Sequence, residues 1–254
     1  MDQPPKPIKT IFPGNMRHFI LETYYKTVPS GIRSLIKGRR RDVVFREAMD
    51  DFLKAPNACA YPGHPVLLDL IYGWGNEAWS ARDEYLAACI TYALTTSGSI
   101  LECGSGLSSI LISAVVKQTN QRHWILEHKA NWRNQVQGYL DFYGLDSTIV
   151  CKPLKEYGDY CWYDVDTESL PADFSLVLCD GPPRRTKGGR YGLIPCMKEK
   201  LKPGCVILLD DANRKDELDI ATRWECELHS SFNVQGKVKP YIHMTLGTSD
   251  NKTT

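Results

Sequence analysis

The residues best suited to chemistry lie in one glycine-rich segment, Ser99-Ile-Leu-Glu-Cys-Gly-Ser-Gly-Leu-Ser-Ser109. A short apolar run leads into Glu102, and Gly104 and Gly106 follow two residues apart, ahead of a second apolar stretch of helical length. This order predicts a strand, a tight turn and a helix. Glycine lets the backbone approach a ligand closely, and the start of a helix offers free N–H groups. The segment therefore predicts a site for a nucleotide-like cofactor.

The acid ahead of the glycines narrows the choice of cofactor. A dinucleotide fingerprint has a third glycine where this chain has Ser109. The carboxylate of Glu102 would repel a pyrophosphate, but it suits S-adenosylmethionine, which carries a sulfonium and an ammonium group and no phosphate. The segment resembles the first motif, Asp/Glu-x-Gly-x-Gly, of the class I S-adenosylmethionine-dependent methyltransferases. The resemblance implies cofactor contacts from Gly104, Gly106, Ser108 and Ser109, with Glu102 near the amino-acid end of the cofactor.

A second carboxylate supports an adenosine ligand. The segment His123-Trp-Ile-Leu-Glu127 reads as a strand that ends in an acid, 23 residues after Gly104. An acid in this place accepts hydrogen bonds from ribose hydroxyls. Because NAD-binding folds share this feature, Glu127 does not choose between the two cofactors. An NAD-dependent sugar-modifying enzyme therefore stays open as an alternative.

The pattern beyond these motifs predicts an α/β fold. Short apolar runs at 147–151, 174–179 and 205–209 read as buried parallel strands, and helical patterns separate them at 83–94, 131–143, 193–201 and 214–228. Two last strands, at 231–238 and 241–246, form a hairpin of the kind that the family adds to its sheet. We expect a Rossmann-like, doubly wound, mostly parallel sheet of seven strands with a C-terminal antiparallel hairpin. The resemblance covers about two thirds of the chain, residues 83–247.

Four predicted strands end in acids, which are Glu102, Glu127, Asp180 and the pair Asp210/Asp211. In open α/β sheets, ligands bind outside the carboxyl ends of the strands. These acids would therefore gather at one edge of the sheet. We expect a negatively charged cleft there, which suits a cationic cofactor.

The richest loop follows the predicted strand at 174–179. It reads Asp180-Gly-Pro-Pro-Arg-Arg-Thr-Lys-Gly-Gly-Arg-Tyr-Gly192 and carries four cations within seven residues. In the family, this place lines the point where methyl donor and acceptor meet. The resemblance makes Asp180 the expected catalytic base and a further cofactor contact, acting directly or through Tyr191. Arg184 and Arg190 are expected to bind an anionic acceptor, with the glycine pair letting Arg190 and Tyr191 close on it.

Three motifs, Asp-Gly-Pro-Pro, Gly-Gly-Arg-Tyr-Gly and Leu-Leu-Asp-Asp-Ala-Asn-Arg214, together look like a poorly characterised group within the family. Catechol-type members bind magnesium with an acid after the fourth strand and an Asp-Asn pair after the fifth. Asp180 and Asp211 match, but Ala212 stands where the asparagine is expected. We therefore predict no metal site, with Mg²⁺ kept as an alternative. Asp211 is an expected acceptor contact and Leu154 an expected cofactor contact.

The first 82 residues follow a different pattern. Residues 1–13 are proline-rich, and helical patterns over 21–53 are interrupted at Pro29-Ser-Gly31. We expect a mainly helical extension at 1–82 with a loose start, and a methyltransferase domain at 83–254. The basic cluster Lys37-Gly-Arg-Arg-Arg41 suits a solvated helix end or contact with an anionic partner. A loop is expected at 72–79, where Trp79 would contact the acceptor.

Composition limits the remaining classes. The 254 residues carry a net charge of +1, which argues against a nucleic-acid partner, and no apolar run is long enough for a transmembrane segment. Nine scattered cysteines favour reduced thiols, and no apolar signal sequence opens the chain, so we expect a cytoplasmic protein. The expected function is methyl transfer to a small, anionic or glycan-type acceptor, with O-methylation favoured. A non-catalytic nucleoside-binding module with this fold is the other alternative.

Overall fold

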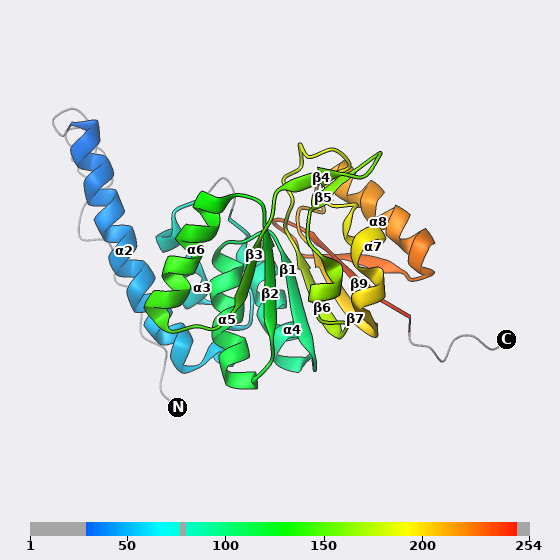
Figure 1. Ribbon diagram of the computed structural model, residues 1–254. Coiled ribbons are helices and arrows are strands. Elements are labelled where there is room, and N and C mark those ends of the chain that lie inside the picture. The colour runs from blue at the N-terminus through cyan, green and yellow to red at the C-terminus, as the bar shows by residue number, and fades with distance from the viewer. Residues whose placement is uncertain (1–28, 77–79, 248–254) are drawn as a thin grey trace.

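One seven-stranded sheet with helices on both faces forms the centre of the protein (Figure 1). The computed structural model describes residues 29–76 and 80–247. The strands, in their order across the sheet, are β3 (Thr148–Cys151), β2 (His123–Glu127), β1 (Ser99–Cys103), β6 (Phe174–Cys179), β7 (Leu201–Leu209), β9 (Tyr241–Thr245) and β8 (Phe232–Gln235). The first five are parallel, and β9 runs antiparallel to both β7 and β8. The predicted sheet and its terminal hairpin are confirmed.

Two hydrophobic cores cover the two faces of this sheet. Successive strand residues point to opposite faces, so Ile100 packs in one core and Leu101 in the other. The first core holds the helices α2 (Ser30–Lys54), α3 (Pro65–Trp74), α4 (Asp83–Thr95), α5 (Leu107–Thr119) and α6 (Ala130–Tyr143), together with the 3-10 turn η1 (Pro56–Cys59). The second core holds α7 (Leu193–Met197) and α8 (Lys215–Leu228).

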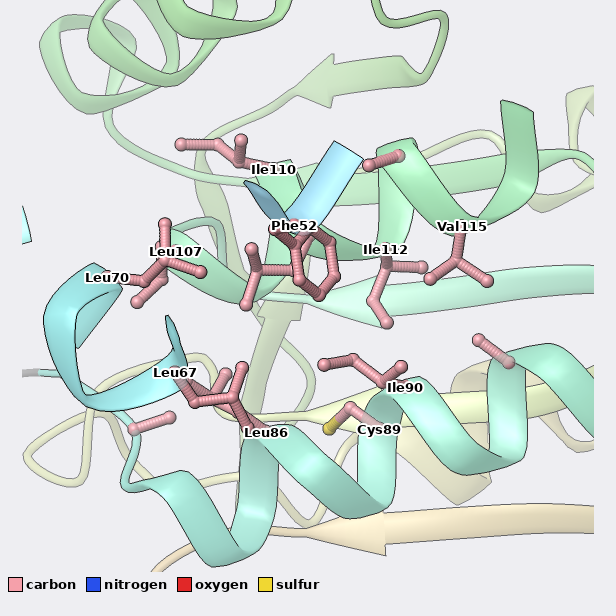
Figure 2. Close-up of a cluster of buried hydrophobic side chains, with 14 of the residues drawn as sticks. Phe52, Leu67, Leu70, Leu86, Cys89, Ile90, Leu107, Ile110, Ile112 and Val115 are labelled. Carbon is pink, nitrogen blue, oxygen red and sulfur yellow. The ribbon is translucent and has the colours of Figure 1, made fainter. Parts of the chain in front are cut away.

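The N-terminal helices are part of the first core. Figure 2 shows Phe52 of α2 and Leu67 of α3 among side chains of α4 and α5, including Ile90 and Ile110. All four side chains are fully buried. The described part of the extension therefore packs against the helices of the sheet, while the proposed boundary between residues 82 and 83 stays a prediction.

The order of the strands creates a switch point between β1 and β6. The chain continues from β1 to β2 on one side, whereas β6 continues to β7 on the other. The loops that leave β1 and β6 therefore diverge at one edge, which is where such sheets bind ligands. The backbone N–H groups of Asp180 and Gly181 donate to the carbonyl of Cys103, at 3.0 and 2.6 Å. These hydrogen bonds tie the two loops together.

The connection from β3 to β6 differs from an ordinary βαβ crossover. In place of an α-helix it has a small hairpin, β4 (Leu154–Glu156) with β5 (Cys161–Tyr163), and a 3-10 turn, η2 (Thr167–Ser169). The sequence analysis did not predict this hairpin, because its strands have only three residues each. Trp162 and Tyr163 are buried in the second core and anchor it there.

The predicted loop at 72–79 is wrong in its first part. Residues 72–74 form the last turn of α3, which ends at Gly75 with a φ of 74°. Gly73 lies against the backbone of Phe45, where a Cβ would come within 2.8 Å of two main-chain atoms. Glycine is therefore needed for the contact between α3 and α2, not for a loop. Residues 77–79, with Trp79, lie outside the described residues.

The predicted helix at 193–201 is also shorter than expected. It consists of α7 followed by the 3-10 turn η3 (Lys198–Lys200), and β7 begins at Leu201. None of the helices in the described residues has both the length and the apolar character needed to cross a bilayer. All nine cysteines are free thiols.

Candidate active site

A cavity of about 820 Å³ opens at the switch point between β1 and β6. Its volume lies within the range of small-molecule sites, and it is large enough for a nucleoside cofactor and a small acceptor. Eight of the residues predicted from the sequence line it: Gly104, Gly106, Ser108, Glu127, Asp180, Arg184, Arg190 and Asp211. Four described residues that were predicted do not line it: Glu102, Ser109, Leu154 and Tyr191.

The two glycines of the loop after β1 differ in what surrounds them. Gly104 has a φ of +87°, and a Cβ there would lie 3.0 Å from the backbone nitrogen of Gly181. The protein itself therefore requires Gly104. A Cβ on Gly106 would meet nothing within 4 Å, although Gly106 lines the cavity. No other described residue occupies that space, so within the described part of the chain it is open to a ligand.

Ser109 and Glu102 support the loop from behind. The N–H of Gly106 donates to Oγ of Ser109 at 3.0 Å, which caps the first turn of α5. The buried carboxylate of Glu102 accepts from Oγ of Ser108 at 2.5 Å and lies 3.0 Å from Nε2 of His123. Glu102 thus fixes the start of α5 to the sheet. Its expected contact with the amino-acid end of the cofactor stays a prediction.

Glu127, at the end of β2, faces the same loop from the other side. Its Oε2 accepts from both the N–H and the hydroxyl of Ser105, at 3.1 and 2.8 Å. Its Oε1 accepts from the N–H groups of His128 and Lys129, at 2.7 and 2.8 Å. The carboxylate is therefore held in one orientation at the cavity wall. Ser105 was missed by the sequence analysis, although its place between the two glycines could have indicated it.

Three aromatic side chains that the sequence analysis missed also line the cavity. They are Trp74 of α3, Trp132 of α6 and Tyr163 of β5. The indole rings of Trp74 and Trp132 meet edge to face at 5.8 Å. Tyr163 is 1% exposed, and its hydroxyl has no hydrogen-bond partner among the described residues. A buried polar group without a partner is uncommon in folded proteins, and a ligand in the cavity would supply one.

A cluster of charges forms the floor of the cavity. The carboxylates of Asp180, Asp210 and Asp211 offer oxygen atoms within 4.8 Å of one another. Nη2 of Arg190 lies 2.8 Å from Asp180 and 2.9 Å from Asp211. Nζ of Lys239 lies 2.7 Å from Asp210 and 3.0 Å from Asp211. Lys239 comes from the turn between β8 and β9, so contacts between distant segments build this cluster.

The neighbours of Asp180 shift its titration towards neutral pH. Burial, and then the negative charge of Asp210, raise the pKa of Asp180 to about 7. Burial also raises the pKa of Asp210. Burial acts in the same direction on Asp211, but the cations of Arg190 and Lys239 outweigh it and lower the pKa of that carboxyl. Asp180 and Asp211 both line the cavity, but the side chain of Asp180 is 29% exposed and that of Asp211 only 4%, so Asp180 is the more accessible of the two to a ligand.

The expected mobile lid after β6 is not what the structure shows. Arg190 is 3% exposed and is enclosed by carboxylates. Tyr191 is 7% exposed, and its hydroxyl donates to Glu227 at 2.5 Å. Gly188 has a φ of +72°, and a Cβ there would lie 2.9 Å from Cα of Tyr160. Gly188 therefore lets the loop pack against the turn between β4 and β5, Gly189 lies close to Ile220 of α8, and Arg190 acts as an internal ion-pair partner.

The charge of the cavity also differs from the expected negative cleft. Among the residues that the structure describes, three carboxylates line it, at Glu127, Asp180 and Asp211, and six cations line it: Lys129, Arg184, Arg185, Arg190, Arg214 and Lys239. The acids are therefore more than balanced by cations from the adjoining loops.

The remaining cations and Leu154 have distinct surroundings. Arg184 is 60% exposed and pairs with Asp216 at 2.7 Å. Arg185 is exposed and lines the cavity without an ion-pair partner among the residues that the structure describes. Leu154 packs against the second core and lies away from the cavity wall. Its expected cofactor contact stays a prediction.

Comparisons with known proteins connect this arrangement to a fold. No family model matches the sequence, and no curated protein is detectably similar to it. Solved structures do match the chain. A Podospora anserina methyltransferase with bound S-adenosylhomocysteine is 13% identical and covers 94% of this chain and 99% of its own, with a TM-score of 0.51. This chain has a methyltransferase fold.

Two further structures share that fold. A Klebsiella pneumoniae protein described as an O-methyltransferase is 14% identical and covers 91% of this chain and 97% of its own, with a TM-score of 0.50. A Staphylococcus aureus protein described as a caffeoyl-CoA O-methyltransferase is 11% identical and covers 81% of this chain and 100% of its own, with a TM-score of 0.53. At these identities the likeness concerns the fold, and the chemistry has to be argued from the site.

Proposed function

We propose that this chain is an S-adenosylmethionine-dependent methyltransferase that methylates an oxygen of a small, anionic or glycan-type acceptor. The observation that carries the proposal is the pairing of two loops at one cavity. Gly104, Gly106 and Glu127 form one wall, as a nucleoside cofactor requires, and Asp180 faces the same cavity from the neighbouring strand. The fold shared with methyltransferases supports it.

The chain offers suitable partners for each part of the cofactor. Glu127 would accept hydrogen bonds from the ribose hydroxyls, and the open space at Gly106 would admit the cofactor close to the backbone. The unpartnered hydroxyl of Tyr163 would gain a hydrogen bond. When bound, the cofactor supplies an activated methyl group, so the protein mainly has to position the acceptor.

Asp180 is the proposed general base. A hydroxyl acceptor has to lose its proton as the new C–O bond forms. With a pKa near 7, the carboxylate of Asp180 can take up that proton at neutral pH. Tyr191 would have to act at a distance, because its hydroxyl donates to Glu227 and it does not line the cavity. Direct action by Asp180 is therefore the version that the geometry favours.

The cations around the cavity support an anionic acceptor. Arg190 is already engaged by Asp180, Asp211 and Glu217, so it is poorly placed to bind a ligand. We propose that Arg185 takes the role that the sequence suggested for Arg190. A guanidinium group suits bidentate capture of a carboxylate or phosphate. Arg184 could assist by exchanging its surface partner Asp216 for the acceptor.

Calorimetry with S-adenosylhomocysteine and with NADH tests the cofactor. We expect the wild type to bind S-adenosylhomocysteine and to bind NADH at least about tenfold more weakly, a difference of about 1.4 kcal/mol. Glu127→Ala should weaken the binding of S-adenosylhomocysteine strongly. Glu199→Ala, which changes an exposed acid on η3, is the matched control. Tight NADH binding, or full affinity in Glu127→Ala, would contradict the proposal.

An acceptor screen with a labelled methyl group tests the chemistry. Carboxylated, phosphorylated and neutral sugars should be compared, and the anionic compounds should be methylated best. Arg185→Ala should raise the acceptor KM without changing the affinity for S-adenosylhomocysteine, whereas Lys198→Ala, on the surface of η3, should change neither. Preferred turnover of neutral compounds, with no effect of Arg185→Ala, would refute the anionic acceptor. We also propose a reducing compartment such as the cytoplasm, consistent with nine free thiols.

A further inference from the structure

Three clustered aspartates, of which Asp180 and Asp211 line the cavity and Asp210 is fully buried, resemble a ligand set for a divalent cation. Their carboxylate oxygens lie within 4.8 Å of one another, and Mg²⁺ prefers oxygen ligands of this kind. Three carboxylates in a partly buried site need positive charge nearby. The question is whether a metal ion has to supply that charge or whether the chain supplies it.

Arg190 occupies the space between two of these carboxylates. Its Nη2 lies within 2.9 Å of both Asp180 and Asp211, and its Nη1 donates to the backbone carbonyl of Asp210 at 2.8 Å. Nη1 also lies 3.4 Å from Glu217 of α8. Because the guanidinium is fully enclosed and holds both loops, it cannot leave without opening the site.

Lys239 supplies the second cation. Its ammonium group is within 3.0 Å of both Asp210 and Asp211. The turn that carries it is tied to α4, because Glu84 accepts hydrogen bonds from the N–H groups of Lys237 and Val238, at 2.8 and 2.9 Å. The side chain of Lys239 is 22% exposed and lines the cavity. Its ammonium group has a third N–H for a ligand there.

Each of the three aspartates thus already has a cation as a partner. Asp211 contacts Arg190, Lys239 and also Arg214, whose Nη1 lies 2.6 Å from it. Asp211 has a φ of 67°, which is an uncommon conformation for a residue other than glycine, and these three cations hold it there.

We propose that Arg190 and Lys239 take the place of a divalent cation among the three aspartates, so that the cluster binds no metal and presents a lysine ammonium to the cavity. This inference concerns the same site as the proposed function, and its relevance to catalysis rests on that proposed function. It is tested with the metal alone and without an acceptor, so the two proposals can fail separately.

The experiment uses Mn²⁺ as the probe, measured by electron paramagnetic resonance and by calorimetry on the full chain. The wild type should show no saturable binding of Mn²⁺. Lys239→Met removes the ammonium and keeps the length of the side chain, so it should gain one Mn²⁺ site. Adding Asp210→Asn to that variant should remove the gained site. Lys237→Met, an exposed lysine in the same turn, is the matched control and should behave as the wild type.

Two results would overturn the inference. The first is a stoichiometric Mn²⁺ site in the wild type that Asp211→Asn abolishes. The second is a folded Lys239→Met protein, judged by circular dichroism, that binds no more Mn²⁺ than the wild type. If Lys239→Met does not fold, Lys239→Gln replaces it, because the amide can still donate to the carboxylates without a charge. The measurement of Mn²⁺ binding to the wild type tests the inference whether or not these variants fold.

Discussion

At the scale of single residues, the surroundings of Asp180 decide its chemistry. Arg190 lies 2.8 Å from its carboxylate and would by itself favour the ionised form. Burial and the charge of Asp210 act in the opposite direction and win, because they raise the pKa to about 7. The result is a carboxyl that can both hold and release a proton at neutral pH. This property is what the proposed role of Asp180 as a general base requires.

The shifted pKa of Asp180 predicts a pH-dependent effect on stability. In the unfolded chain its pKa takes the ordinary value of 3.8, whereas in the folded protein it is about 7. Between these values the folded state keeps a proton that the unfolded state has released, so rising pH favours unfolding. The free energy of unfolding of the wild type, relative to Asp180→Asn, should therefore fall as the pH rises from about 4 to about 7, and then stay constant.

Urea denaturation at several pH values measures this difference. Asp69→Asn, a change of an exposed acid on α3, provides the control and should show no such trend. The difference in the free energy of unfolding between the wild type and Asp180→Asn could instead be the same at every pH. That result would show that Asp180 titrates like an ordinary aspartate. The experiment needs no acceptor, so it can be done before the substrate is known.

Three of the predicted residues that line the cavity lie at the end of a strand. Gly104 directly follows β1, Glu127 ends β2 and Asp180 directly follows β6, so their position in the cavity followed from the strands. Lys239 and Tyr163 could not be found in this way, because they reach the cavity through a distant turn and an unpredicted hairpin. Arg190 was predicted to bind the acceptor, whereas its burial among acids of other segments could not be predicted from its own loop.

At the scale of elements, the turn between β1 and α5 combines two separate requirements. Gly104 is constrained by the protein, since the loop after β6 packs against it. Gly106 is not constrained by any neighbour within 4 Å. The sequence shows two glycines two apart and does not distinguish them, because the distinction depends on Gly181, which lies 77 residues after Gly104 along the chain.

Serine substitutions separate these two requirements. Gly104→Ser should destabilise the fold by about 1–3 kcal/mol, because a left-handed φ and close contact with Gly181 both disfavour a side chain. Gly106→Ser should leave the melting temperature nearly unchanged, because serine is a good residue at the start of a helix. Its side chain would instead enter the cavity and weaken the binding of S-adenosylhomocysteine. Thermal unfolding and calorimetry on both variants check this. Equal effects of the two changes on stability would contradict it.

The other elements show which parts of the fold a sequence pattern can predict. Strands buried on both faces gave continuous apolar runs, and all seven strands of the sheet were predicted within a few residues of their observed ends. The hairpin of β4 and β5 gave no such run, since only Trp162 and Tyr163 among its residues are fully buried. The last turn of α3 was predicted as part of a loop. Its Gly73 instead allows a close contact with α2.

At the scale of the whole molecule, the first core extends across the proposed domain boundary. Phe45, Met49 and Phe52 of α2 belong to the same buried cluster as Ile100 and Leu176 of the sheet. Helices that share a core with the sheet should unfold together with it. The first half of α2, in contrast, carries exposed apolar side chains such as Leu35 and projects beyond the rest of the protein in Figure 1.

A substitution in α2 should therefore destabilise the whole protein. Phe52 is fully buried between α3, α4 and α5 (Figure 2), so Phe52→Ala should cost about 3–5 kcal/mol. Calorimetry should show a single unfolding transition in the wild type, and that whole transition should move to lower temperature in Phe52→Ala. Leu35→Ala, at a side chain that is 58% exposed on the same helix, should leave it unchanged. If Phe52→Ala instead produced a separate early transition and left the main one in place, the N-terminal extension would be an independent unit, although Trp74 of α3 lines the cavity at the switch point.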